Sequence, residues 1–428
     1  MDKKSLKSLV CASFLAAVGL VSVADAVEPR VYQLGDGGAV APHVRLEFGT
    51  DNNPLRSDDG SQESVYLRLQ PSARYLVRQR NNRLELGYSG DFYNYFESYC
   101  AGNQTVRPGD CLNGAPSSNS ASYQDHSLSL LGFLEISSRL RATLTASVDV
   151  ENQPLGTGQS ATRNILNSLT ETESWTRRTV RAEVAYGADR ARGRVIAGVT
   201  AGDRAFNSPR GDFDNLEERG VGPDVRLLYR IGTRTQLFAG LGISTVRGGD
   251  SERDISRQIA GIQLDTSAIT SGRFSVSNVT EDFVGNASGR RDLQFFGWNA
   301  ELTWRPRRFS TVTLSGGRES ERGFFDDDIG LRTQIEAEWT HFWRDRFSTI
   351  VSVSVDLNED LDEFSELTDA EDDAISFRLE GDYSIRRWLD IGAFFIIDSR
   401  NGRDFVDGTE NSRDFGRTVV GITANGTI

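Results

Sequence analysis

The chain alternates apolar and polar residues in short segments from about Val44 to the C-terminus. In the run RLELGYSGDFYNY (83–95), Leu84, Leu86 and Phe92 lie on one face of an extended strand, and the polar residues between them lie on the other. One face suits lipid and the other suits water. This pattern is typical of a strand in a transmembrane β-barrel.

The same alternation predicts about eighteen strands, an even number, as expected of a single-chain bacterial barrel. The predicted strands cover residues 43–49, 64–70, 83–95, 127–136, 140–150, 176–186, 194–202, 224–231, 235–246, 256–266, 273–281, 293–305, 311–319, 331–342, 349–357, 374–385, 388–398 and 417–428. The segment 273–281 fits worst, because Val276 and Val279 fall on opposite faces. We expect a β-bulge or an error in the assigned register there.

The connections between these strands differ in length at the two ends of the predicted barrel. Short turns at 79–82, 137–139, 232–234 and 386–387 are expected to face the periplasm. Long polar connections are expected to face outside; they are 50–63, 97–125, 151–174, 203–222, 320–330, 358–373 and 399–414. A soluble propeller would show a regular internal repeat, and we find none in the sequence. Soluble sandwiches rarely combine short turns at one end with long loops at the other, so both soluble all-β folds are disfavoured.

The fold class predicted from these patterns is all-β. We expect a closed antiparallel transmembrane β-barrel of about 18 strands, with short periplasmic turns and long extracellular loops. A lumen of this width would hold a water-filled channel, which folded-in loops would narrow.

Aromatic residues are placed where interfacial girdles would put them. They are Phe92, Tyr95 and Phe96 near the outer end of one strand, and Trp304, Trp339, Trp343 and Trp388 near inner ends. The alternative is ordinary strand propensity, since aromatic residues favour β-structure anywhere.

The N-terminus has the features of a secretory signal peptide. Lysines precede an apolar stretch from about 9 to 21, and Ala24–Ala26 forms a small-x-small cleavage motif. We predict a signal peptide at 1–26, cleaved after Ala26, then a periplasmic segment at 27–42 and the barrel at 43–428. The mature protein is expected in the bacterial outer membrane.

Composition narrows the function further. The mean hydropathy is −0.41, and no later apolar run approaches the roughly 18 to 20 residues of a membrane-spanning helix. The net charge of −13 argues against a nucleic-acid partner. Every lysine lies in the signal segment, so the mature chain is cationic only through arginine. A genomic preference for arginine codons would explain the lack of lysine in the mature chain without any functional role for the arginines.

Charged residues are frequent on the predicted inward face. The inward arginines are Arg45, Arg68, Arg141, Arg181, Arg226, Arg230, Arg257, Arg305, Arg332, Arg378 and Arg417. The inward carboxylates are Glu47, Glu85, Asp91, Asp149, Glu183, Asp265, Glu301, Glu336, Glu338, Asp356, Glu380, Asp382 and Asp390. Such density implies a hydrated interior, because charges in an apolar core would be costly.

Two interpretations of this wall remain open. In the structural one, arginines and carboxylates cross-link neighbouring strands. In the functional one, arginines exchange hydrogen bonds with the hydroxyls and carboxylates of a passing sugar polymer. The residues assigned to that substrate path are Arg68, Arg141, Arg181, Arg226, Arg230, Arg257, Arg332 and Arg378.

Two cysteines remain in the mature chain, Cys100 and Cys111, and a polar, loop-like segment separates them. In an oxidising compartment we expect them to form a disulfide that staples a surface loop. The acidic run 359–373 is interpreted as a solvated loop, with divalent cations bridging it to lipopolysaccharide as the alternative. It lacks EF-hand spacing, so no metal site is predicted.

Enzymatic motifs are nearly absent. The three histidines are His43, His126 and His341, and neither a GxSxG nor an HExxH pattern occurs. By alternation, His341 faces lipid or the interface near an aromatic cluster. We therefore expect neither enzymatic activity nor a cofactor.

Several segments resemble the putative β-barrel porin type 2 family. They are Thr50–Asn53 after the first strand, Leu69–Pro71, the run 83–95, and WNAELTWRPRRFSTVTLSGGRES at 298–320. The chain departs from the family where it has Asp51-Asn52-Asn53 instead of a doubled Asp before Asn, and where it ends in Ile428 rather than an aromatic residue. The family is often encoded with exopolysaccharide biosynthesis genes, so the resemblance implies a role in exopolysaccharide export.

The sequence thus leads to one favoured hypothesis, a passive outer-membrane channel for a secreted polysaccharide. Its expected partners are outer-membrane lipid and lipopolysaccharide, the polysaccharide, and periplasmic export machinery. The alternatives are a general diffusion porin for small solutes and a structural or adhesive barrel.

Overall fold

The computed structural model describes residues 31–35, 37–57, 63–96, 121–157, 172–188, 191–207, 217–248, 251–264, 269–284, 292–322, 329–361, 367–406, 409–412 and 414–427. The strands are β1 (Tyr32–Leu34), β2 (Gly38–Asp51), β3 (Ser64–Gln79), β4 (Asn82–Tyr95), β5 (Tyr123–Ser137), β6 (Leu140–Gln153), β7 (Glu173–Tyr186), β8 (Gly193–Phe206), β9 (Glu218–Arg230), β10 (Thr235–Gly248), β11 (Ser251–Leu264), β12 (Thr270–Val284), β13 (Leu293–Arg307), β14 (Ser310–Arg322), β15 (Ile329–Arg344), β16 (Phe347–Leu361), β17 (Leu367–Arg386), β18 (Leu389–Val406), β19 (Thr409–Ser412) and β20 (Phe415–Gly426). No helix within these ranges is long and apolar enough to span a membrane.

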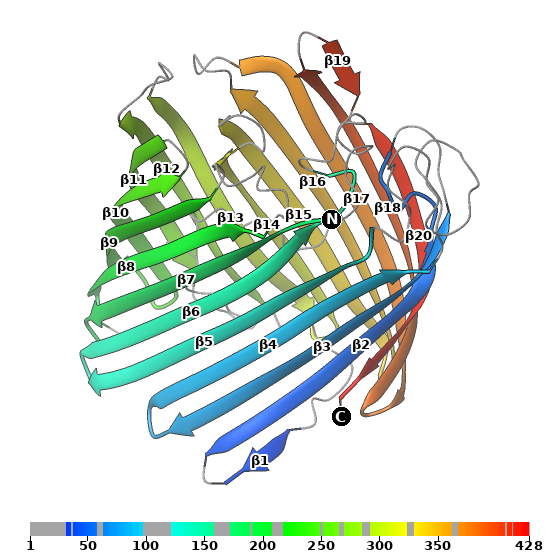
Figure 1. Ribbon diagram of the computed structural model, residues 1–428. Coiled ribbons are helices and arrows are strands. Elements are labelled where there is room, and N and C mark those ends of the chain that lie inside the picture. Colours follow the sequence, from blue (N-terminus) through cyan, green and yellow to red (C-terminus); the bar gives the residue numbers. More distant parts are fainter. Residues whose placement is uncertain are drawn as a thin grey trace.

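The strands form one closed ring. Each strand from β2 to β18 pairs antiparallel with the next, and β20 closes the ring by pairing with β18 and β2. The described residues therefore form an 18-strand antiparallel barrel, and they confirm the predicted fold class. Figure 1 shows the strands running obliquely around it, with β1 beside β2 at the lower end.

The two ends of the barrel differ as expected. At the end that carries β1, neighbouring strands are joined by short turns, for example between β3 and β4 at 79–82 and between β17 and β18 at 386–389. The opposite end carries the longer connections, but β16 and β17 reach further into one of them than predicted. The acidic run 359–373 is therefore largely strand rather than loop, because hairpin pairing continues past the barrel rim.

Segment 270–284 contradicts the expected bulge. β12 pairs with both β11 and β13 without a register shift. Val279 faces inward and is only 1% exposed, because it packs in a cluster on the inner wall with Phe295 and Leu331. An inward apolar cluster, not an irregular backbone, therefore explains the broken alternation.

Strand β14, which follows β13 in the ring, separates from β13 toward the outer end of the barrel. Their pairing there ends at Trp298 with Arg318, although β14 continues to Arg322. Beyond this point the hydroxyl of Ser320 donates to Glu281 on β12, at 2.5 Å. The outer end of β14 thus leans over the inner face of β12.

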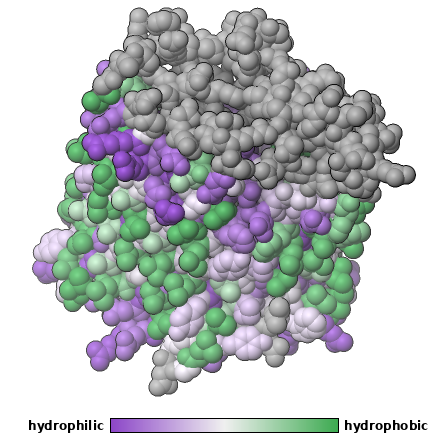
Figure 2. Space-filling view, in the orientation of Figure 1, coloured by the Kyte–Doolittle hydropathy of each residue, from purple (hydrophilic) through white to green (hydrophobic). Residues whose placement is uncertain are grey.

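The outer face of the barrel is apolar. Exposed side chains such as Leu241, Ile243 and Ile422 project from it, and Figure 2 shows hydrophobic residues over its middle, with hydrophilic residues toward both rims. Trp304 and Trp343 are exposed on this face, where a girdle requires them. Alternation therefore assigns lipid-facing and lumen-facing residues correctly along these strands.

Two adjacent residues on β6 test this assignment. Val148 faces outward and Ser147 faces inward, where it lies opposite Ser129 and Thr179 in register. We expect Val148→Arg to destabilise the folded barrel by about 2–4 kcal/mol, the cost of a charge on the lipid face near the midplane.

Urea unfolding in lipid vesicles, followed by heat-modifiable migration on gels, measures this difference. Ser147→Arg is the matched control and is expected to stay close to the wild type, because its charge enters the hydrated lumen. Equal destabilisation by both substitutions would contradict the assignment of faces.

Candidate functional site: the charged lumen wall

A first charged cluster on the inner wall centres on Glu47 of β2. Its carboxylate is 2% exposed and contacts three guanidinium groups, those of Arg45 at 2.8 Å, Arg68 at 3.3 Å and Arg378 at 3.2 Å. Arg378 lies on β17, so its side chain crosses the inner faces of β18 and β20 to reach β2. On the way its guanidinium lies 4.9 Å from the centre of the Phe394 ring. The cluster therefore spans the pair of strands that closes the barrel.

Two more carboxylates balance the charge of this cluster. Asp91 on β4 pairs with Arg68 at 2.6 Å. Glu380 on β17 pairs with both Arg45 and Arg378, each at 2.7 Å. Because each guanidinium has carboxylate partners, the cluster contributes hydrogen-bonding groups to the wall without a net charge.

A second compensated cluster lies across β7, β8 and β9. Arg181 is 3% exposed and contacts Glu183 at 2.6 Å, Asp224 at 2.7 Å and the hydroxyl of Thr200 at 2.7 Å. Arg226 on β9 also pairs with Glu183. Two cations thus share two anions, and this part of the wall is neutral as well.

Near the outer end of the closing strand, Arg417 of β20 holds two carboxylates. It contacts Asp51 of β2 at 2.7 Å and Asp398 of β18 at 3.0 Å. The hydroxyl of Tyr95 donates to Asp51 at 2.6 Å. Tyr95 therefore faces the lumen, and its expected place in an aromatic girdle is wrong, because it has the same parity as the inward Tyr93.

Ion pairs also connect the strands on the other side of the barrel. Arg332 on β15 pairs with Asp356 on β16. Arg253 on β11 contacts Glu218 at 2.9 Å and Glu281 at 3.3 Å, on the strands to either side of the β10–β11 hairpin. Cross-linking of neighbouring strands is thus a widespread role of the inward arginines.

The remaining arginines assigned to the substrate path lie apart from these clusters. Arg141 lies opposite Glu135 in register near the short turn between β5 and β6. Arg230 donates to the carbonyl oxygen of Thr233 at 3.0 Å in an exposed turn. Arg257 lines a recess in the wall. The structure therefore brings together Arg68 with Arg378 and Arg181 with Arg226, whereas these three residues lie elsewhere.

Three tyrosines form a stack on the inner wall of β3, β4 and β5. The ring centres of Tyr66 and Tyr93 are 4.6 Å apart, and those of Tyr93 and Tyr123 are 5.3 Å apart. Alternation along 83–95 puts Tyr93 on the face opposite Phe92, but it does not reveal the stack, because register between strands decides which rings meet.

Two segments that follow strands at the outer end cover this stack. Leu55, after β2, and Leu155, after β6, are each nearly fully buried in the cluster that contains Tyr66 and Tyr93. A guanidinium nitrogen of Arg56 lies 3.4 Å from the carbonyl oxygen of Leu155, so the two segments also contact each other. Residues 52–57 and 154–157 therefore narrow the lumen, as expected of folded-in loops.

The described residues include all three histidines of the chain. Within these ranges, no three His, Cys, Asp or Glu side chains are arranged to hold a metal ion. His341 packs against Phe309, Trp339 and Trp343 in an aromatic cluster, as the sequence predicts. The predicted disulfide between Cys100 and Cys111 lies outside the described residues.

The apolar outer surface and the charged inner wall define a transmembrane β-barrel of the porin class. The chain belongs to a family described as putative beta-barrel porin 2, whose model matches residues 37–425. Membership places the protein in the bacterial outer membrane, in a family of channels that are typically transport proteins rather than enzymes.

Solved structures with similar folds are distant. The FrpB iron transporter from Neisseria meningitidis is 8% identical, with coverage of 90% of this chain and 81% of that one and a TM-score of 0.42. A BenF-like porin from Pseudomonas fluorescens Pf-5 is 11% identical, with coverage of 91% and 99% and a TM-score of 0.43. A bacterial polysaccharide outer membrane secretin is 10% identical, with coverage of 90% and 98% and a TM-score of 0.33. No curated protein matches the chain.

The contact between the two lumen segments depends on Gly156. Its φ is +75°, and a Cβ there would lie 2.1 Å from the carbonyl oxygen of Leu55. We expect Gly156→Ala to displace one segment from the other and so raise single-channel conductance in planar bilayers. The control is Gly232→Ala, in a short turn where a Cβ would meet no atom within 4 Å. Unchanged conductance in Gly156→Ala would show that these segments do not limit the channel.

The Arg417 cluster is expected to stabilise the barrel at its closing strand. Arg417→Gln leaves Asp51 and Asp398 without their shared cation, which costs about 3–5 kcal/mol for a buried pair. Arg178→Gln, which removes an exposed pair with Asp203, should cost no more than about 1 kcal/mol. Urea unfolding in vesicles measures both values, and equal costs would contradict a special role for the closing strand.

Proposed function

We propose that this barrel is the outer-membrane channel through which a secreted polysaccharide leaves the cell. The observation that carries the proposal is the compensated wall of the lumen. In the clusters around Glu47 and Arg181, guanidinium and carboxylate groups neutralise one another, and the partly exposed guanidinium groups of Arg45 and Arg378 present donors to the lumen. A polymer with many hydroxyls exchanges weak hydrogen bonds with such a wall at every step.

Weak and repeated contacts suit transport better than one tight site. Conduction requires that binding be favourable enough to enter and weak enough to leave. Because each guanidinium in these two clusters already has an anionic partner, neither cluster holds a large unbalanced charge that would trap a charged solute. The family resemblance also points to exopolysaccharide, and the export machinery that delivers the polymer would dock at the periplasmic end.

A diffusion porin for small solutes is the second candidate. The narrowing of the lumen by residues 52–57 and 154–157 favours it, since a narrowed lumen limits the size of freely diffusing solutes. The two functions differ in the effect of removing the protein from the cell.

A clean deletion strain tests the proposal. We expect extracellular polysaccharide to fall sharply, and a wild-type copy to restore it while the protein fractionates with the outer membrane. The copy that carries Ser147→Arg should also restore secretion, and the copy that carries Val148→Arg should not, because its barrel fails to assemble. Normal secretion by the deletion strain, together with slower uptake of small sugars, would instead support the diffusion porin.

A further inference from the structure

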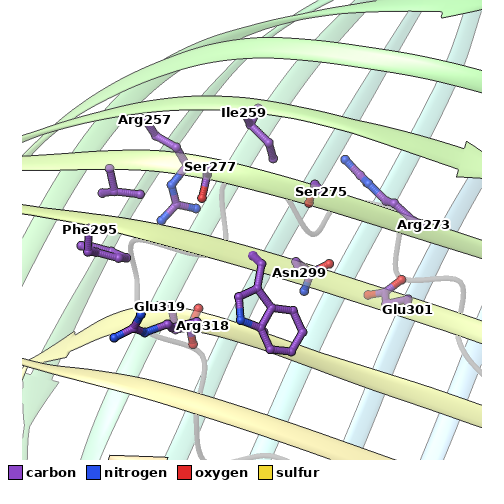
Figure 3. Close-up of a pocket in the computed structure, with 13 residues that line it drawn as sticks. Arg257, Ile259, Arg273, Ser275, Ser277, Phe295, Asn299, Glu301, Arg318 and Glu319 are labelled. Carbon is purple, nitrogen blue, oxygen red and sulfur yellow. The ribbon is translucent and has the colours of Figure 1, made fainter. Parts of the chain in front are cut away.

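A recess opens in the inner wall between β11 and β14. In Figure 3, Ser275 and Asn299 lie between Arg257 at one end and Arg273 with Glu301 at the other. These residues project from β11, β12 and β13, which pair continuously here, whereas on its other side the recess is lined by Arg318 and Glu319 of β14, where the pairing with β13 ends.

The polar groups of this recess differ from those elsewhere in the lumen. Arg273 and Glu301 lie directly opposite each other in register on β12 and β13. Yet among the described residues neither side chain takes part in a hydrogen bond or ion pair, in contrast to the clusters around Glu47 and Arg181. The side chains of Ser275 and Asn299 likewise make no hydrogen bond within the described part of the chain. The recess therefore contains four polar side chains whose donors and acceptors are free to bind a ligand.

Arg273 is held in position without using its donors. Its guanidinium lies 4.5 Å from the centre of the Phe238 ring on β10. The ring fits there because residue 261, between them on β11, is glycine: a Cβ at Gly261 would lie 2.5 Å from the ring of Phe238. A cation–π contact engages the face of a guanidinium, whereas its N–H donors point outward in its plane. The donors of Arg273 therefore stay available to a ligand in the recess.

The set of free groups defines the ligand. Arg273 offers only donors, the Glu301 carboxylate offers only acceptors, and the hydroxyl and amide groups of Ser275 and Asn299 offer both. A ligand that satisfies all of them must carry donors and acceptors side by side, as the neighbouring hydroxyls of a sugar ring do. Because a carboxylate lines the recess opposite the cation, an acidic sugar would meet repulsion as well as attraction.

We infer that this recess binds a neutral sugar residue of the transported polymer. The inference rests on the proposed function and makes it more specific, because it gives the wall a defined binding site for an uncharged, hydroxyl-rich sugar ring. Arg273 donates to sugar oxygens, Glu301 accepts from sugar hydroxyls, and the serine and asparagine contact the hydroxyls between them.

Current block in planar bilayers tests the site on the purified full-length barrel. The probes are glucan, galactan and mannan hexamers as neutral sugars, and a galacturonan hexamer as the acidic one. We expect at least one neutral hexamer to block the current more strongly than the acidic hexamer. Arg273→Gln and Glu301→Gln should each weaken that block by roughly tenfold or more, the effect of losing a hydrogen bond to a charged group.

Arg74→Gln is the matched control, since it removes a guanidinium that pairs with Glu85 on the far side of the ring, nine strands from β12. It should leave the block unchanged. Heat-modifiable migration confirms that each variant forms a barrel. The inference is overturned if no neutral hexamer blocks the channel, if the variants block like the wild type, or if the acidic hexamer binds better and Glu301→Gln strengthens it.

Secretion by the deletion strain separates this inference from the proposed function. Normal secretion combined with a block that depends on Arg273 and Glu301 would leave the sugar site standing and remove the export role. Lost secretion combined with a block that these substitutions do not change would support the export role and rule out the sugar site.

Discussion

The structure depends on one constraint, which is that the backbone of every strand in a lipid bilayer must find hydrogen-bond partners within the protein. The chain meets it by pairing β20 with β2, which joins the last strand of the ring to the first. Side chains support this contact: Arg378 reaches Glu47 across β18 and β20, and Arg417 joins Asp51 to Asp398. Closure of the ring and charge pairing in the lumen are therefore parts of the same solution.

Charge pairing also determines what kind of surface the lumen presents. A wall of unpaired arginines would attract and retain anions, and a wall without charges would offer a polymer few contacts. Mutual compensation around Glu47 and Arg181 gives hydrogen-bonding groups without a strong field. Against this background the recess at Arg273 and Glu301 is distinctive, because within the described residues these two side chains make no hydrogen bond or ion pair.

Alternation along the chain was sufficient to predict the strands, the fold and the inward position of most charged residues. Alternation also puts Tyr95 on the lumen face, because Tyr95 has the same parity as Asp91 and Tyr93. Its aromatic character suggested a membrane girdle instead. Partners could not be predicted, because Arg378 and Glu47 are 331 residues apart and meet only through closure. Arg273 was missed because Val279, which packs in an inward apolar cluster, made its strand look irregular.

The cations of the wall are all arginines, since the lysines of the chain lie before the predicted cleavage site. A guanidinium keeps its proton at any pH a cell encounters, whereas a lysine amine can lose it in a desolvated site. The positive half of each pair in the lumen is thus permanent. A bacterium that meets alkaline surroundings at its outermost surface, where no cytoplasm buffers the pH, would keep the same electrostatic lining in this barrel.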